Sequence, residues 1–101
     1  MEKDQIHIAI VDDHTLFRNG VASLMGEFEE LKVVFEAENG EQMQQMLTKH
    51  PAPHVILMDI NMPVMNGYDA TRWLKDKYPQ IKVLALSMFE DDKAVIRMIK
   101  S

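Results

Sequence analysis

A chain of 101 residues has room for one domain, here residues 1–101, and 47% hydrophobic with 27% charged residues is typical of a soluble globular protein. The absence of cysteine excludes disulfides, a thiolate nucleophile and cysteine-ligated zinc, and a formal net charge of -5 argues against nucleic-acid binding by this domain itself. The amino-terminal segment has neither the apolar core of a signal peptide nor a membrane-spanning run, so we expect a cytoplasmic protein without a membrane partner.

The first half of the chain alternates apolar runs of strand length with a helical pattern. The runs Ile6–Val11 and Leu31–Ala37 predict two strands, and the second is the weaker because Lys32 and Glu36 interrupt it. Between the two runs, apolar residues recur at helical spacing and predict a first helix. These residues are Leu16, Phe17, Val21, Leu24 and Met25.

The second half of the chain continues this alternation. A second helix is predicted between Asn39-Gly40 and Pro51, because these residues are typical of a helix start and a helix end. Strands are predicted at residues 55–58 and 81–86, with a third helix between them and a fourth helix after them. The apolar residues that mark these three helices are Met43, Met46 and Leu47, then Ala70, Trp73 and Leu74, then Ala94, Val95, Met98 and Ile99. We interpret the methionines among them as core residues.

The chain is predicted to contain four strands, each followed by a helix. Such alternation indicates right-handed crossover connections and a mostly parallel sheet with helices on both faces. The segments IHIAIV, VILM and IKVLAL are nearly continuous apolar runs, as expected for strands that are covered on both faces. The sequence therefore predicts an α/β fold.

Polar side chains follow the predicted strands where a parallel sheet usually binds its ligands. Asp12 and Asp13 follow the first strand, Asp59 and Asn61 follow the third, and Ser87 ends the fourth. Because the carboxyl ends of parallel strands meet at one edge, we expect the three carboxylates to converge. Crowded carboxylates repel one another unless a cation lies among them, and oxygen ligands favour Mg²⁺ or a similar hard ion over zinc.

Each acidic residue has a simpler interpretation when it is taken alone. A single Asp after a strand is most often a helix N-cap or a turn residue, and for Asp13 capping is as good an explanation as metal binding. Capping does not explain two adjacent acids after one strand and a third after another. A catalytic role for His14 is conceivable beside these acids, but the first turn of a helix is the simpler explanation for this residue.

Three segments resemble the signature regions of response regulator receiver domains. They are VDDHTLFRNG at residues 11–20, MDINMPVMNG at 58–67 and LALSMF at 84–89. The first segment is most similar to the subgroup that carries a helix-turn-helix output domain. The resemblance covers essentially the whole chain and implies a flavodoxin-like, doubly wound parallel sheet.

The resemblance also implies a role for each residue of the site. It makes Asp59 the aspartate that accepts a phosphoryl group from a histidine kinase. Asp12 and Asp13 match the acidic pair of the Mg²⁺ site, and the main-chain carbonyl of Asn61 matches a further ligand of the ion. Ser87 matches the hydroxyl residue that binds the phosphoryl group. The domain would be a signalling protein that is not an enzyme in its own right.

The chain departs from the family pattern at its carboxyl end. Receivers usually continue into a fifth strand and helix, with an aromatic switch residue and a Lys that pairs with the phosphoryl group. This sequence ends at Ser101, and Lys93 and Lys100 match neither position. We therefore expect a truncated receiver with the sheet order 2-1-3-4, with impaired phosphorylation, and with a homodimer that forms through the edge at residues 81–86.

Other functions explain part of the pattern. A receiver remnant that binds Mg²⁺ or protein without useful phosphorylation remains an alternative, because the expected Lys is missing. A metal-dependent phosphohydrolase would usually have its Asp nucleophile after the first strand and a second acid two residues later, and Asp12-Asp13 lacks this spacing. A flavin-binding protein is disfavoured because two acids occupy the loop in which a phosphate would need hydrogen-bond donors.

Overall fold

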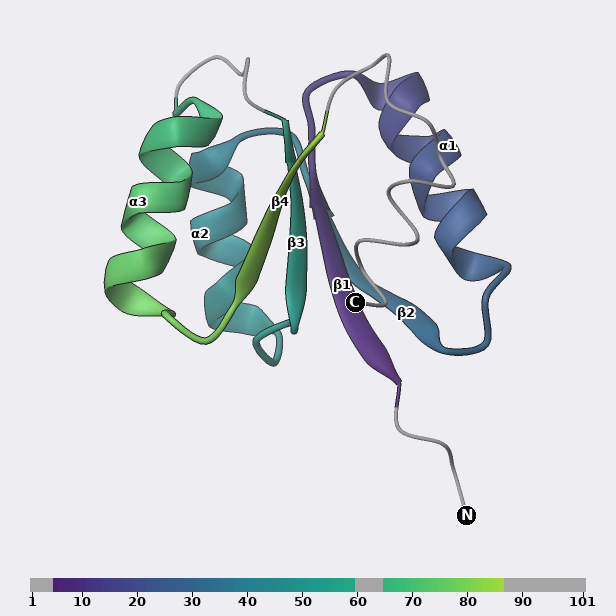
Figure 1. The fold of residues 1–101 in the computed structure, drawn as a ribbon. Coiled ribbons are helices and arrows are strands. Elements are labelled where there is room, and N and C mark those ends of the chain that lie inside the picture. Colours follow the sequence, from purple (N-terminus) through teal and green to yellow (C-terminus); the bar gives the residue numbers. More distant parts are fainter. Residues whose placement is uncertain (1–4, 60–64, 87–101) are drawn as a thin grey trace.

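A computed structural model of the protein describes residues 5–59 and 65–86, in which four strands alternate with three helices (Figure 1). The elements are β1 (Ile6–Val11), α1 (Thr15–Gly26), β2 (Leu31–Ala37), α2 (Gly40–Lys49), β3 (Val55–Asp59), α3 (Gly67–Lys77) and β4 (Lys82–Leu86). β1 and β2 have the predicted bounds, whereas β3 extends one residue further, to Asp59, and β4 begins one residue later, at Lys82. The predicted fourth helix lies outside the described residues.

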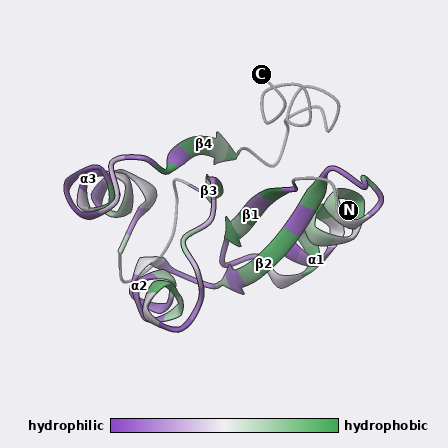
Figure 2. Ribbon diagram, turned by 90° about the horizontal axis from the view of Figure 1, so that it is seen from below, coloured by the Kyte–Doolittle hydropathy of each residue, from purple (hydrophilic) through white to green (hydrophobic). Residues whose placement is uncertain are grey.

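The four strands form one parallel sheet in the order β2-β1-β3-β4. This order confirms the predicted flavodoxin-like arrangement. Helix α1 covers one face of the sheet, and α2 and α3 cover the other (Figure 1). A view turned by 90° shows the same three layers, with the sheet between the helices (Figure 2).

Two apolar cores lie on opposite faces of the sheet, because successive residues of a strand point to opposite faces. On β1, Ala9 and Val11 belong to the core beneath α2 and α3, and Ile8 and Ile10 belong to the core beneath α1. The helices contribute buried residues at helical spacing: Val21 and Met25 from α1, Met43 and Leu47 from α2, and Ala70 and Leu74 from α3. The interpretation of Met43 as a core residue is confirmed.

A register shift interrupts the pairing of β1 with β2. Ile8 pairs with Val33 but Ala9 pairs with Phe35, so Val34 is an extra residue in β2. Before the shift, Leu31 and Val33 pack in the core beneath α1; after it, Phe35 packs in the core beneath α2 and α3. The shift therefore reverses the alternation of β2 between the two faces.

Polar residues and one close contact determine where α2 and α3 begin. The side chain of Asn39 accepts a hydrogen bond from the Gln42 amide at 2.8 Å, and Asn66 does the same for the Asp69 amide at 2.9 Å. Gly40, the first residue of α2, contacts Met65 so closely that a Cβ at Gly40 would lie 2.6 to 2.8 Å from three side-chain atoms. The segment before α3 is thus packed against the start of α2.

None of the described helices is both long and apolar enough to cross a membrane.

Candidate functional site

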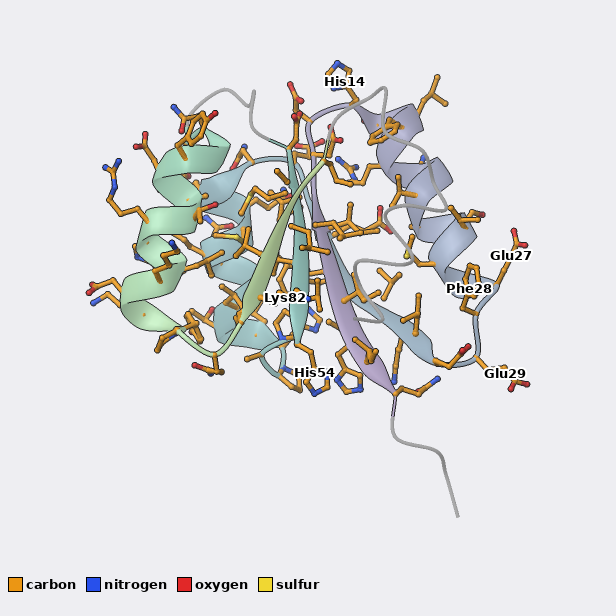
Figure 3. All side chains as sticks on the ribbon, in the orientation of Figure 1. His14, Glu27, Phe28, Glu29, His54 and Lys82 are labelled. Carbon is orange, nitrogen blue, oxygen red and sulfur yellow. The ribbon has the colours of Figure 1, made fainter. Side chains whose placement is uncertain are left out.

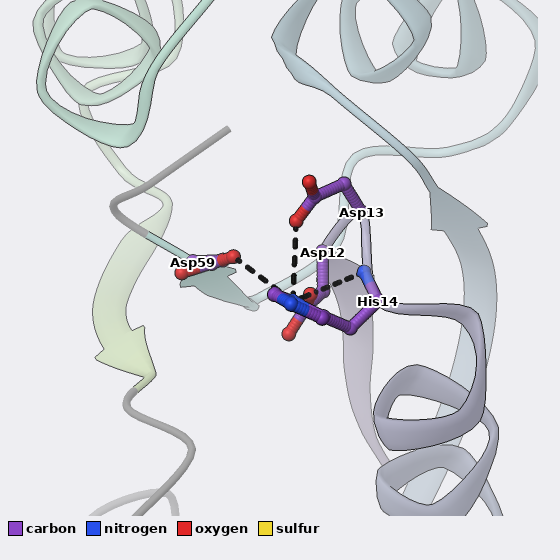
Figure 4. A group of neighbouring side chains, drawn as sticks. All are labelled: Asp12, Asp13, His14 and Asp59. Atoms are coloured by element: carbon purple, nitrogen blue, oxygen red, sulfur yellow. Dashed lines mark hydrogen bonds and ion pairs between the residues drawn. The ribbon is translucent and has the colours of Figure 1, made fainter. Parts of the chain in front are cut away.

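Three carboxylates meet at the edge of the sheet where β1 and β3 end, as predicted. Asp12 and Asp13 follow β1, and Asp59 is the last residue of β3. One ligand atom from each of these residues, and one from His14, lie within 4.8 Å of one another (Figure 4). In Figure 3, His14 marks this edge, and His54 lies at the opposite end of the strands.

Asp12 is the most deeply buried residue of this cluster, with a side chain that is 1% exposed. Its carboxylate Oδ1 accepts a hydrogen bond from the His14 amide at 2.8 Å, which turns the chain from β1 towards α1. Its own amide donates to the carbonyl of Ala37 at 3.0 Å, so β2 holds the same residue. A buried carboxylate requires such compensation because burial disfavours its charged form.

His14 lies at the start of α1, as the simpler interpretation of this residue predicts, and it also belongs to the cluster. Its Nδ1 lies 3.3 Å from a carboxylate oxygen of Asp12, 3.3 Å from one of Asp13 and 3.9 Å from one of Asp59 (Figure 4). His14 is also the N-cap residue of α1, but its side chain makes no capping hydrogen bond. The ring therefore lies over the acids instead of over the helix.

Capping does not explain Asp13 either. Helix α1 begins after His14, so Asp13 precedes the N-cap position. Its carboxylate lies beside the His14 ring, and the residue is exposed. The interpretation of Asp13 as the N-cap of the first helix is wrong, and the interpretation as a member of the acidic cluster stands.

The donor set of the cluster fits a hard divalent cation. Ligand atoms around one Mg²⁺ ion are about 3 to 4.2 Å apart, so a spread within 4.8 Å requires only small side-chain adjustments. Asp12, Asp13 and Asp59 would hold the ion through carboxylate oxygens, the ligand type that Mg²⁺ prefers. Two other predicted site residues, Asn61 and Ser87, lie outside the described residues.

Comparison with protein families gives an independent identification of this arrangement. Residues 8–101 match the family of the response regulator receiver domain. The chain is 44% identical over 101 residues to the transcriptional regulatory protein DegU of Brevibacillus brevis, and it spans 42% of that protein. It therefore corresponds to less than half the length of this relative.

Solved structures with a similar fold are also receivers. The signal receiver domain of the response regulator NarL from Mycobacterium tuberculosis superposes with a TM-score of 0.74 at 27% identity, over 97% of this chain and 78% of that one. The response regulator RcsB from Salmonella enterica, bound to the promoter rprA in the presence of the phosphomimetic BeF3-, gives a TM-score of 0.76 at 25% identity. That match covers 84% of this chain and 43% of RcsB.

Proposed function

Because the chain belongs to the response regulator receiver family, we propose that it accepts a phosphoryl group on Asp59 from a histidine kinase in the presence of Mg²⁺. The side chains of Asp12, Asp13 and Asp59 and the main-chain carbonyl of Asn61 are the proposed ligands of the ion. Ser87 is the proposed hydroxyl contact of the phosphoryl group. The observation that carries this proposal is the convergence of three carboxylates at the carboxyl ends of β1 and β3.

Asp12 and Asp59 have different surroundings, which supports Asp59 over Asp12 as the acceptor. Asp12 is buried and hydrogen-bonded to the His14 amide, so it is poorly placed to meet an incoming donor. Asp59 ends a strand at the centre of the sheet and is more exposed than Asp12. A cation in the site would offset the charge on the acceptor and on the phosphoryl oxygens, which repel each other otherwise. The residues of the chain then need only to orient the Asp59 oxygen towards phosphorus.

The proposed output of the domain lies beyond this chain. The chain spans about two fifths of DegU, whose printed name is that of a transcriptional regulator, and RcsB was solved on a promoter. We therefore propose that phosphorylation of this receiver controls a DNA-binding part of a longer protein. The net charge of -5 supports an indirect role in DNA binding.

Intact-mass spectrometry after incubation with a small phosphodonor and Mg²⁺ tests the proposal. The wild-type chain should gain the mass of one phosphoryl group, and Asp59→Asn should gain none because its amide oxygen is a much weaker nucleophile. Asp13→Ala should be phosphorylated more slowly and should bind Mg²⁺ more weakly in an amide-shift titration.

The same experiment separates the alternative functions. A chain that binds Mg²⁺ but never gains the phosphoryl mass would be a metal-binding remnant. A phosphoryl group on another residue, or full modification of Asp59→Asn, would contradict the assignment of Asp59.

A further inference from the structure

An arginine from α1 lies directly behind the acidic cluster. Arg18 is only 12% exposed, and its Nη1 donates a hydrogen bond of 2.7 Å to the main-chain carbonyl of Asp12. Its Nε donates to the carboxylate of Glu36 on β2 at 3.2 Å. One guanidinium thus connects α1, the end of β1 and β2, and a fork of several donors makes this double contact possible.

The contact with Glu36 depends on the register shift in β2. Leu31 and Val33 face α1, so regular alternation would also point Phe35 towards α1 and Glu36 away from it. The extra residue Val34 reverses this order, so that Glu36 reaches Arg18 on α1. A local irregularity in the sheet therefore places the carboxylate that holds the arginine.

The main chain of Asp12 is held from two sides as a result. Its amide donates to the Ala37 carbonyl at 3.0 Å, and its carbonyl accepts from Arg18 at 2.7 Å. The Asp12 carbonyl belongs to the peptide unit that leads into Asp13. The direction of this peptide sets where both acidic side chains leave the backbone, because a peptide unit is planar.

We infer that Arg18 is a positioning residue for the cation site, held in place by Glu36. This inference rests on the proposed function, since it assumes that Asp12, Asp13 and Asp59 bind Mg²⁺. Arg18 does not take part in the chemistry itself. It fixes the main chain from which Asp12 and Asp13 project, and such supporting contacts typically change metal affinity about 10- to 100-fold.

Charge and positioning predict opposite effects of removing Arg18. A guanidinium near three acids repels a divalent cation, so its loss would strengthen Mg²⁺ binding if charge alone mattered. Loss of the Arg18 hydrogen bond to the Asp12 carbonyl would instead weaken Mg²⁺ binding, because the side chains of Asp12 and Asp13 would have to become ordered when the ion binds. The sign of the change in affinity therefore distinguishes the two explanations.

The test is an amide-shift titration with Mg²⁺ on the wild-type chain and on three variants. Arg18→Met removes both donors and the charge while it keeps the apolar stem, and it should raise the Kd about tenfold. Arg18→Lys keeps the charge but cannot bridge both acceptors, and it should also raise the Kd, by a smaller factor. Glu36→Gln should raise the Kd as well. In all three variants the Asp13 amide resonance should shift before any Mg²⁺ is added.

Two controls separate positioning from general effects. Arg72→Gln removes one positive charge from a side chain that is 82% exposed, and it should leave the Kd and the Asp13 amide resonance unchanged. Val55→Ala opens the core at the far end of β3, and it should lower the unfolding temperature without a change in the Kd.

Each outcome has a defined meaning. An unchanged or lower Kd in Arg18→Met, with Mg²⁺ binding by the wild type, would refute the positioning role alone. An equal rise of the Kd in Val55→Ala would refute it too, because general destabilisation would then be sufficient. If the wild-type chain does not bind Mg²⁺, the cation site of the proposed function is wrong, and the role of Arg18 in it falls with that site.

Discussion

Gly40 is the residue at which α2 meets the segment that leads into α3. A Cβ on this residue would lie 2.8 Å from the Cβ of Met65 and even closer to its Cγ and Sδ. Rotation of the Met65 side chain can move Cγ and Sδ but not Cβ, which is fixed to the main chain. The backbone around Met65 must therefore move to admit any larger residue at position 40.

Gly40→Ala should accordingly lower the stability of the protein. Alanine favours a helix by about 1 kcal/mol relative to glycine, but an enforced shift of packed main chain usually costs about 1 to 3 kcal/mol. Thermal unfolding should show a decrease in the midpoint for Gly40→Ala. Gly20→Ala should show an increase, because apart from the adjacent residues and the backbone of α1 no atom lies within 4 Å of the added Cβ. An increase for both variants would mean that Met65 adapts freely.

Sequence reasoning was successful for the acidic residues and incomplete for the residues around them. Asp12, Asp13 and Asp59 could be grouped because the ends of parallel strands share one edge, whatever the side-chain rotamers are. The place of His14 depends on its rotamer, and the place of Arg18 depends on a carboxylate that comes from another strand. Neither depends on residue spacing alone, so the sequence left the place of His14 undecided and gave no sign of the role of Arg18.

At the level of elements, α2 begins with a side-chain cap that does not depend on the acidic cluster. Asn39 accepts a hydrogen bond from the Gln42 amide, while the Gln42 side chain accepts one of 2.7 Å from the Glu38 amide. The first of these bonds satisfies one of the amides that the first turn of a helix leaves without an intrahelical partner, and the second ties the Gln42 side chain to the residue before the cap.

Asn39→Ala should reduce the free energy of unfolding by about 1 kcal/mol, because it removes the acceptor for the Gln42 amide. Asn39→Asp is the matched control, since it keeps the acceptor and adds a negative charge at a helix start, where such a charge is favourable. Urea denaturation measures both values. Equal stability of Asn39→Ala and the wild type would show that water replaces the cap without loss.

The order of the strands and helices was predictable from the sequence, but the register shift inside β2 was not. The apolar periodicities predicted four strands and three described helices in the correct order, and Pro51 follows the end of α2 as expected. The register shift in β2 was not predicted. In the segment LKVVFEA, residues 31, 33, 35 and 37 are all apolar, so the pattern fits regular alternation and does not reveal that the alternation reverses at Val34.

At the level of the whole molecule, the face of α1 carries an apolar groove. Leu16 is 88% exposed, Phe17 and Leu24 are half-buried, and Val21 is buried. Together with Gly20 they line a groove of about 310 Å³. Within the described part of the chain, β4 pairs only with β3 and so forms an edge of the sheet. Both features are typical of surfaces that bind another protein.

We expect the 101-residue chain to self-associate through these surfaces. Light scattering over a range of protein concentrations should show a mass that increases towards that of a dimer. Leu16→Glu should shift the transition to higher concentration, because a charge would have to be buried at the groove. Tyr68→Glu is the matched control, since Tyr68 is a similarly exposed hydrophobic residue on α3. A wild-type chain that stays monomeric throughout would contradict the predicted homodimer.

The extra residue in β2 has a consequence for how this sequence can change in length. Val34 divides β2 into two halves. Before it, the apolar side chains pack in the core beneath α1; after it, they pack in the core beneath α2 and α3. Loss of this one residue would restore regular pairing, and it would turn Phe35 towards α1 and Glu36 into the apolar core on the other side. Most single substitutions in β2 alter one contact, whereas a one-codon deletion would exchange the surroundings of every residue between Val34 and the acidic edge. We expect the length of β2 to be under stronger selection than the identity of most of its residues.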